Sequence, residues 1–277
     1  MARSLADIRH RGEISFIVSK IAITGKGGVG KTTLTSLLAY TYAQQDRQVL
    51  VIDADPNANL AEALGIPDAQ QRITPVVEME DLIAERTGAT PGTYGAFFKM
   101  NPRVDDIPDR FSVIHRGIRL LVMGTVDHGG SGCVCPESVV LKSLVTHLLI
   151  QRDEMLIMDM EAGIEHLGRA TAQAVDSFVI VVEPGRRSIQ TARTIRRLAQ
   201  EIGIPRIVAV GNKVRGPSDR AFIAQQLSDF SVLGFLPYSS EAIEADLRGV
   251  PIFDAAPDLV AQAQVIARAL LEPVQTN

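Results

Sequence analysis

A glycine-rich segment near the start of the chain has the residue types and spacing of a phosphate-binding loop. Residues 25–33 read Gly-Lys-Gly-Gly-Val-Gly-Lys-Thr-Thr, which satisfies the pattern of Gly, four residues, Gly, Lys and Thr. Glycines leave the backbone N–H groups free to face a triphosphate, and a helix that begins at such a loop favours anions through its dipole. The residues that we predict to contact the nucleotide here are Gly25, Lys26, Gly27, Gly28, Val29, Gly30, Lys31, Thr32 and Thr33.

Three side chains of this loop have separate expected roles. We expect Lys31 to lie along the β- and γ-phosphates, Thr32 to bind Mg²⁺ through its hydroxyl group, and Thr33 to support the α-phosphate side. The alternative is a glycine-rich turn without function. The apolar strand expected over residues 20–24 and the helical spacing over residues 34–42 favour the nucleotide site.

The additional lysine of the loop, Lys26, narrows the predicted family of nucleotide-binding proteins. A lysine directly after the first glycine resembles the deviant Walker A ATPases, which include nitrogenase iron protein, partition ATPases and tail-anchor targeting factors. The resemblance implies that this lysine crosses a dimer interface and touches the partner's ATP, as an arginine finger does when supplied in trans. It implies a homodimer that closes around two nucleotides. The alternative is a solvated lysine on a loop.

An acidic motif follows the apolar run at residues 49–53, and reads Asp-Ala-Asp-Pro-Asn-Ala-Asn over residues 53–59. Carboxyl ends of strands are where α/β sheets bind ligands. The resemblance implies that this stretch is switch I, and that Asp55 orients or deprotonates the attacking water. We expect Asp53 and Asn59 to lie around Mg²⁺. Simple turn chemistry at a strand end is the alternative for both aspartates.

A second acidic motif, Asp-Met-Glu-Ala-Gly, occupies residues 159–163 after another apolar run. Asp159 fits a Walker B aspartate that holds Mg²⁺ through a water molecule, and we expect the Gly163 backbone N–H to sense the γ-phosphate. Glu161 stands where glycine or proline is more usual, and its direction is left open between Mg²⁺, solvent and the partner.

The adenine base has weaker candidate contacts. Asn212 and Lys213 follow the apolar run at residues 207–210 and resemble an adenine-facing pair. Pro237 and Tyr238 follow the next apolar run, and we expect them to pack against the base.

The chain has two cysteines, Cys133 and Cys135, separated by one residue. This spacing is poor for a disulfide between them, and Pro136 suits the first position of a helix, which puts Cys135 near its cap. Thiophilic ions such as Zn²⁺ want about four ligands, so a two-fold dimer would supply two cysteines from each copy. The alternative is that the two cysteines lie at the start of a helix without a metal-binding role. For His128 and His166, a local or solvated role is favoured over metal binding.

Three stretches narrow the resemblance further. They are Cys-Val-Cys-Pro-Glu at 133–137, Asp-Met-Glu-Ala-Gly-Ile-Glu-His-Leu at 159–167 and Asn-Pro-Arg-Val-Asp-Asp-Ile-Pro at 101–108. Together they resemble the CooC-type nickel-insertion accessory ATPases of carbon monoxide dehydrogenase. The resemblance implies that the two cysteines hold Ni²⁺ or Zn²⁺ between subunits, and that ATP hydrolysis to ADP assists nickel delivery to carbon monoxide dehydrogenase or a related nickel enzyme. The catalytic residues that it implies are Lys26, Lys31, Asp55 and Asp159.

The elements that must position these residues alternate along the chain. Continuous apolar runs predict buried strands at 20–24, 49–53, 120–123, 155–159, 178–182, 207–210 and 232–236. Helical spacing covers 136–150, 189–202, 221–227, 240–248 and 258–271. This alternation predicts a doubly wound α/β fold with a mainly parallel sheet and helices on both faces. We expect residues 84–109 to be an irregular surface insert near the dimer face.

Length and composition suit one domain. The chain has 277 residues, 46% of them hydrophobic, and a formal net charge of −4. A mildly acidic chain is a poor nucleic-acid binder, and no apolar run reaches the ~20 residues of a membrane-spanning helix. We expect a cytoplasmic protein with no nucleic-acid or membrane partner. We expect a single ATPase domain over residues 18–277 and a disordered extension over residues 1–17, for which a start at Val18 is the alternative.

Three rival functions are compared from the sequence. An electron-transfer ATPase of the nitrogenase iron protein type would hold an iron–sulfur cluster at the dimer axis, but that type takes its cysteines from well-separated loops. A partition or positioning ATPase has no need of the Cys-X-Cys segment, and the tail at 271–277 lacks the basic residues of a membrane-binding helix. A structural zinc dimer would leave the nucleotide loop and both acidic motifs without a role.

Overall fold

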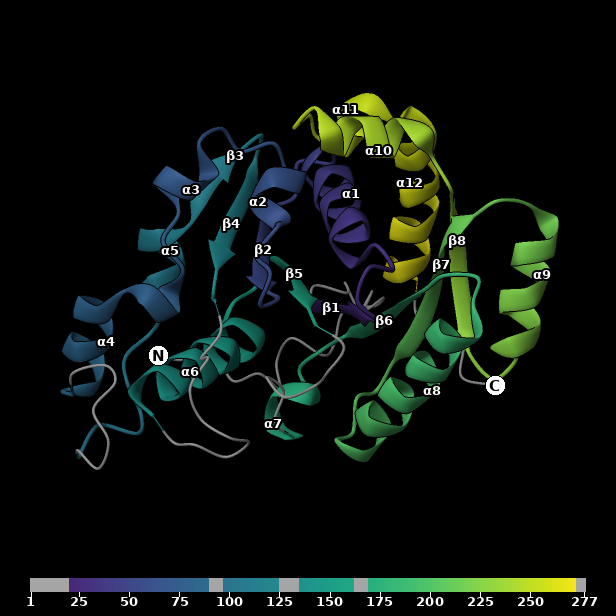
Figure 1. The fold of residues 1–277 in the computed structure, drawn as a ribbon. Helices are drawn as coiled ribbons and strands as arrows, with labels where there is room; N and C mark the ends of the chain where they lie inside the picture. Colours follow the sequence, from purple (N-terminus) through teal and green to yellow (C-terminus); the bar gives the residue numbers. More distant parts are fainter. Residues whose placement is uncertain (1–19, 90–96, 125–134, 162–168, 273–277) are drawn as a thin grey trace, which may run out of the picture.

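The fold is built on one eight-stranded sheet with the strand order β3-β4-β2-β5-β1-β6-β7-β8 (Figure 1). In this computed structural model, the structure describes residues 20–89, 97–124, 135–161 and 169–272. All neighbouring strands run parallel except β3, which pairs antiparallel with β4. The strands are β1 Lys20–Gly25, β2 Val49–Ala54, β3 Val113–His115, β4 Ile118–Val122, β5 Met155–Met160, β6 Ser177–Val182, β7 Ile207–Val214 and β8 Ser231–Pro237.

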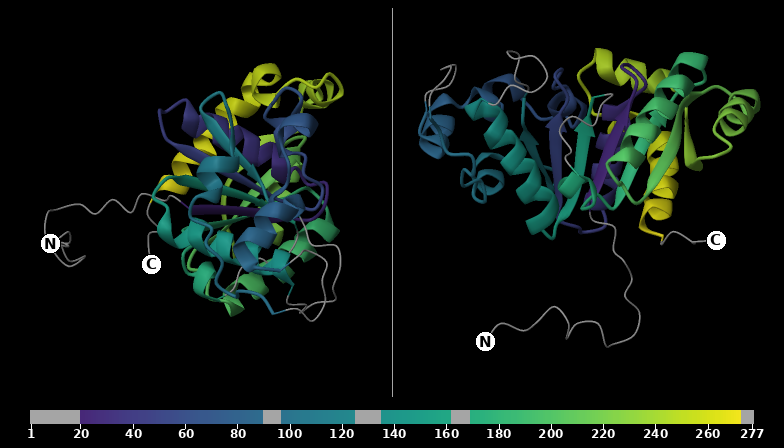
Figure 2. Two further views of the ribbon diagram at one scale, coloured as in Figure 1. Left: turned by 90° about the vertical axis from the view of Figure 1, so that its left-hand side faces the viewer. Right: turned by 90° about the horizontal axis from the view of Figure 1, so that it is seen from below.

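Helices cover both faces of the sheet, which confirms the predicted doubly wound α/β class (Figure 2). The helices are α1 Lys31–Ala43, α2 Leu60–Ala63, α3 Ala69–Arg72, the 3₁₀ helix η1 Val76–Glu78, α4 Glu80–Thr87, α5 Ile107–Phe111, α6 Pro136–Gln151, α7 Arg169–Ala172, α8 Arg186–Glu201, α9 Pro217–Gln226, α10 Ser240–Leu247, α11 Ile252–Ala255 and α12 Pro257–Leu271. No helix in these described ranges is long and apolar enough to cross a membrane.

Two hydrophobic cores lie on opposite faces of the sheet. Strand β2 shows the division, because Leu50 and Ile52 pack into the core beneath α4, α6, α8 and α9, whereas Val49 and Val51 pack into the core beneath α1, α2 and α12. A strand that is buried on both faces must be apolar at successive positions, and all six residues of β2 are buried. The apolar runs therefore predicted the positions of the central strands correctly.

The structure differs from the expected elements in three places. The stretch 84–109 is not irregular throughout, because α4 ends and α5 begins within it, and Val104 and Ile107 are buried in a core; residues 90–96 lie outside the described residues. Strand β3 was missed because three residues are too few to show a periodicity. Strand β7 extends past its apolar run to Val214, so Asn212 and Lys213 belong to the strand itself.

Candidate functional site

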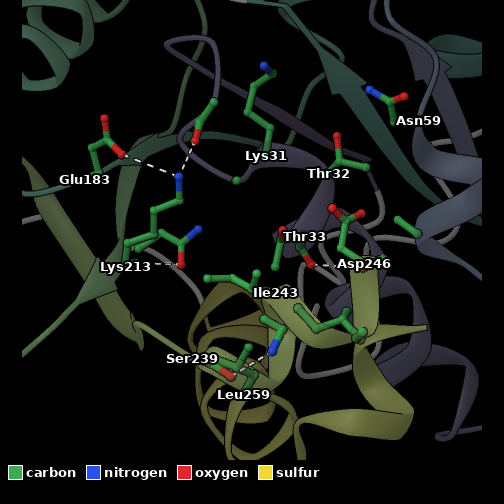
Figure 3. A pocket seen from close by; sticks show the side chains of 18 of the residues that line it. Lys31, Thr32, Thr33, Asn59, Glu183, Lys213, Ser239, Ile243, Asp246 and Leu259 are labelled. Carbon is green, nitrogen blue, oxygen red and sulfur yellow. Dashed lines mark hydrogen bonds and ion pairs between the residues drawn. The ribbon is translucent and has the colours of Figure 1, made fainter. Parts of the chain in front are cut away.

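A cavity of about 1290 Å³ opens at the carboxyl ends of the central strands, where the loop between β1 and α1 faces α10 and α12. Figure 3 shows Lys31, Thr32 and Thr33 on one side of it, and Ser239, Ile243 and Leu259 on the other. Its volume is sufficient for a nucleotide. The cavity thus combines the loop of residues 25–33 with a wall from the last quarter of the chain.

Backbone geometry explains two of the loop glycines. Gly25 has φ of +153°, and a Cβ atom there would lie 2.5 Å from the Val181 carbonyl oxygen of β6. Gly30 has φ of +92°, and its Cβ would lie 2.1 Å from Asn212 Nδ2. A side chain fits neither position. Helix α1 begins directly after Gly30, so its first backbone N–H groups face the cavity as an anion site.

Lys31 forms an ion pair with the switch I aspartate. Its Nζ lies 3.3 Å from Asp55 Oδ2, and both side chains are largely buried. Asp55 Oδ1 also accepts the Asn57 backbone N–H at 3.0 Å, which fixes the loop after β2. Phosphate oxygens entering beside Lys31 would compete with Asp55 for the ammonium group. Departure of Lys31 would leave the Asp55 carboxylate free to orient a water molecule.

The Thr32 hydroxyl group and the Asp159 carboxylate form the candidate Mg²⁺ site. Thr32 Oγ1 donates to Asp159 Oδ2 at 2.7 Å, and Asp159 Oδ1 is buried without a hydrogen-bond partner among the described residues. Burial raises the pKa of Asp159 to about 7. Hard oxygen ligands suit Mg²⁺, and a bound cation would pair the orphaned oxygen and favour the charged form. The residues present therefore fit the ion.

Asp53 hydrogen-bonds the loop that follows β2, and its expected place around Mg²⁺ stays a prediction. Its Oδ1 accepts the Asp55 backbone N–H at 3.2 Å and its Oδ2 accepts the Leu60 N–H at 3.0 Å. It is 1% exposed and does not line the cavity, whereas Asn59 does. Burial raises the pKa of Asp53 to about 6. Asp53 therefore shapes the switch I loop from behind.

Lys26 does not line the cavity of its own chain. Its Nζ instead lies 4.0 Å from Glu183 Oε1, directly after β6. Lys213 Nζ lies 3.7 Å from the other oxygen of Glu183 and donates to the Gly28 carbonyl oxygen at 2.5 Å (Figure 3). The sequence analysis missed Glu183, although an acid after a buried strand is the same signal that singled out Asp53 and Asp159.

The four predicted base contacts all line the cavity, and Asn212 also supports the phosphate loop. Asn212 is 5% exposed, its Nδ2 donates to the Val29 carbonyl oxygen at 2.8 Å, and its Oδ1 accepts the Lys213 N–H at 2.8 Å. It supports the phosphate loop, while the Val29 side chain is buried in a core. Pro237 and Tyr238 line the cavity. The α10 residues Ile243 and Asp246 line it too, and no sequence signal pointed to them.

Cys135 caps the N-terminus of α6. Its Sγ accepts the Ser138 backbone N–H at 3.4 Å, and the Ser138 hydroxyl group accepts the Cys135 N–H at 3.2 Å. Among the described residues, no cluster of three or more potential metal ligands is present. Four residues considered in the sequence lie outside the described ranges, namely His128, Cys133, Gly163 and His166.

Known proteins resemble this chain over most of its length. Residues 20–252 match the family described as CobQ/CobB/MinD/ParA nucleotide binding domain. The carbon monoxide dehydrogenase accessory protein CooC of Rhodospirillum rubrum is 48% identical over 92% of this chain and 97% of that relative. An uncharacterised ATP-binding protein of Methanocaldococcus jannaschii is 47% identical over 84% of this chain and 90% of its own.

Solved structures agree on the fold. The MinC:MinD cell division protein complex of Aquifex aeolicus contains a chain that matches with a TM-score of 0.66 and 22% identity, covering 93% of this chain and 97% of that one. The phosphate loop, the paired switch residues and these matches together confirm the predicted class of enzyme. The chain is an ATPase that belongs to the CobQ/CobB/MinD/ParA nucleotide-binding family, in the branch that includes the R. rubrum CooC protein.

Proposed function

We propose that this protein is a metal-binding maturation factor that uses ATP hydrolysis to assist nickel insertion into carbon monoxide dehydrogenase. It works as a nucleotide-dependent homodimer, with one Ni²⁺ or Zn²⁺ held between the subunits by Cys133 and Cys135 of each copy. The observation that carries the proposal is the similarity to the R. rubrum CooC protein over nearly the full length of both chains.

The position of Cys135 supports a metal site at the start of α6. A thiolate is the form of cysteine that binds metal, and a helix N-terminus stabilises negative charge. The Cys135 sulfur already accepts one backbone N–H there. Two thiolates per chain make half of a four-ligand site, so a two-fold axis beside α6 completes it.

The position of Lys26 supports the same assembly. Its ammonium group is 4.0 Å from Glu183 and does not line the cavity of its own chain, which suits a contact with the triphosphate of a second copy. Each Lys26 gains a phosphate partner in the closed dimer. Closure changes the arrangement of the four sulfur atoms, and metal affinity and nucleotide state are then coupled reciprocally.

The residues at the cavity have separate roles in ATP hydrolysis. Lys31 and the loop N–H groups bind and orient the phosphates, and Asp55, once freed from Lys31, orients the water for in-line attack. Thr32 and Asp159 would hold Mg²⁺, which supplies neutralising charge to the phosphate oxygens. Hydrolysis weakens the clamp between subunits and releases the metal to a docked client enzyme.

Metal content and molecular mass, measured together, test this proposal. The wild type, purified with Ni²⁺ or Zn²⁺ and the non-hydrolysable analogue AMPPNP, should form a dimer with one ion per two chains by elemental analysis and light scattering. The Cys133→Ala/Cys135→Ala variant should bind the nucleotide and lose the ion. His147→Ala removes a half-buried imidazole from the same helix and should keep the ion. A wild type that stays monomeric under nickel, zinc and AMPPNP contradicts the proposal.

Coupling between the two ligands is tested separately. Ni²⁺ affinity should differ between the AMPPNP-bound and ADP-bound protein, because the four sulfur atoms are arranged differently in the two states. Equal affinities in competition titrations would leave a metal-binding ATPase without a delivery mechanism.

A further inference from the structure

The Glu183 carboxylate lies between two lysines at the edge of the cavity. Oε1 is 4.0 Å from Lys26 Nζ and Oε2 is 3.7 Å from Lys213 Nζ, so each oxygen faces a different ammonium group. The three side chains are between 30% and 45% exposed. They come from β6, β1 and β7, which are neighbours in the sheet.

The backbone holds Glu183 in a fixed position. Its N–H donates to the Ser188 hydroxyl group of α8 at 3.1 Å, and Pro184 restricts the conformation of the residue before it. Strand β6 ends immediately before Glu183 and is buried throughout. The backbone that carries the Glu183 carboxylate is therefore fixed, and the longer lysine side chains extend toward it.

Lys213 and Lys26 are held to different degrees. Lys213 has φ of +56°, an uncommon conformation for a lysine, and its Nζ also donates to the Gly28 carbonyl oxygen, so it is tied to the phosphate loop. Lys26 has Glu183 as its one charged partner among the described residues. Loss of Glu183 would leave Lys213 with a second anchor and Lys26 with none.

Nucleotide and Glu183 compete for the same cations. Glu183 lines the cavity beside Gly27 and Gly28, where a triphosphate would carry negative charge close to the carboxylate. Lys26 can reach the phosphates of a partner subunit only by leaving Glu183. The ion pair of the free subunit is thus an alternative to the contact that closes the dimer.

We propose that Glu183 is a positioning residue that holds Lys26 against its own subunit and thereby sets the protein concentration at which ATP drives dimerisation. The inference rests on the proposed nucleotide-dependent dimer. It adds that the ion pair between Lys26 and Glu183 must break before the dimer closes. It explains why an acidic side chain stands at the edge of an anion-binding cavity, where its own charge opposes the ligand.

The first test measures dimerisation at saturating Mg²⁺ and AMPPNP, so that differences in nucleotide affinity do not contribute. Glu183→Gln should lower the concentration of half-dimerisation by about threefold to tenfold, because each subunit no longer gives up an exposed ion pair. Turnover per dimer at saturating protein should stay within about twofold of wild type. Glu62→Gln, the matched control, removes a charge from the same cavity at a residue with no ion pair in the described part of the chain, and should leave the midpoint unchanged.

The second test needs no dimer. In dilute, nucleotide-free protein, the rate of Lys26 acetylation by an amine-reactive ester, followed by mass spectrometry, should rise severalfold in Glu183→Gln relative to the exposed Lys142 of α6. Glu183→Asp, which keeps the charge on a shorter side chain, should fall between the two.

The outcomes distinguish a failure of the proposed dimer from a failure of the proposed restraint by Glu183. A wild type that never dimerises removes the trans role of Lys26 and this inference with it. A wild type that dimerises, with an unchanged midpoint in Glu183→Gln, overturns the restraint while the proposed function stands. An unchanged Lys26 labelling rate overturns the restraint as well, whatever the midpoint.

Discussion

Two buried carboxylates meet at the ends of neighbouring strands. Asp53 of β2 and Asp159 of β5 are paired in the sheet register, and burial raises the pKa of both, to about 6 and about 7. Asp53 also raises the pKa of Asp159, and Asp55 raises the pKa of both, because like charges oppose one another. The protonation of this pair is therefore set by what enters the cavity, and a cation favours the charged form.

The nucleotide-free protein should lose stability as pH rises from about 4 to about 7. A carboxylate whose folded pKa is raised stabilises the fold at low pH, and this contribution is lost as pH rises through the folded pKa. Asp159→Asn should reduce the loss, which we expect to be on the order of 1 kcal/mol, in urea unfolding at pH 5 and 7.5. Asp46→Asn, at an exposed turn, should keep it.

Asp53 also titrates in this pH range and is present in both proteins, whereas Asp106 does not titrate there. Arg110 and Arg86 lower the pKa of Asp106 to about 2, so that its contribution is lost only as pH falls below about 4. Identical pH dependence in wild type and Asp159→Asn would refute the assignment of the loss to this carboxylate.

Single residues differ in how well the sequence predicted them. Lys31, Thr32, Asp55 and Asp159 were expected near one another, because acids after buried strands and a lysine in a glycine loop must meet at one edge of a parallel sheet. The hydrogen bonds of Asp53 and Asn212 were not predictable. Both side chains are buried, and they bond to backbone groups whose positions depend on the tertiary fold.

At the scale of elements, the end of β7 supports the phosphate loop from behind. Asn212 and Lys213 donate to the carbonyl oxygens of Val29 and Gly28. With these carbonyls held on the far side, the loop N–H groups remain available to a ligand. The register of β7 against β8 shifts between Gly211 and Val214, and this irregularity brings both side chains within reach of the loop.

Gly30→Ala should destabilise the nucleotide-free protein by about 1–3 kcal/mol, because the new Cβ would sit on Asn212 Nδ2 and the backbone has positive φ. Gly27→Ala, where a Cβ meets nothing within 4 Å, should change the free energy of unfolding by less than about 1 kcal/mol. Urea unfolding of both variants provides the comparison, and equal losses would show that the contact with β7 is unimportant.

Elements with strong patterns were predictable and short ones were not. The central strands are buried on both faces, so continuous apolar runs marked them. Strand β3 and the short helices α2, α3 and α11 have three or four residues each. Such segments are formed by packing against a completed sheet and carry too few residues for a periodic signal.

At the scale of the whole molecule, the two lysines of the phosphate loop have different surroundings, as the proposed dimer requires. Lys31 lines the cavity of its own chain and Lys26 does not. Lys26→Ala should therefore reduce turnover by about 10³-fold, as loss of an arginine finger does. AMPPNP affinity of the dilute protein should change by less than about threefold, by isothermal titration.

Lys31→Ala is the matched variant and should abolish binding of the nucleotide itself. A Lys26→Ala protein with wild-type turnover, or one that loses nucleotide binding at low protein concentration, would place this lysine in its own subunit's site.

Helix α6 also connects the proposed cysteine site to the strand that carries Asp159. It begins after Cys135, ends at Gln151, and leads through one turn into β5, which carries Asp159. The turn is held in place, because Lys20 Nζ donates to the carbonyl oxygens of Arg152 and Glu154, and Asp109 pairs with Arg152. Sixteen residues of helix span about 24 Å, so a tilt of about 5° at the pinned end displaces the cysteine end by about 2 Å. A displacement of that size matches the length of a metal–ligand bond.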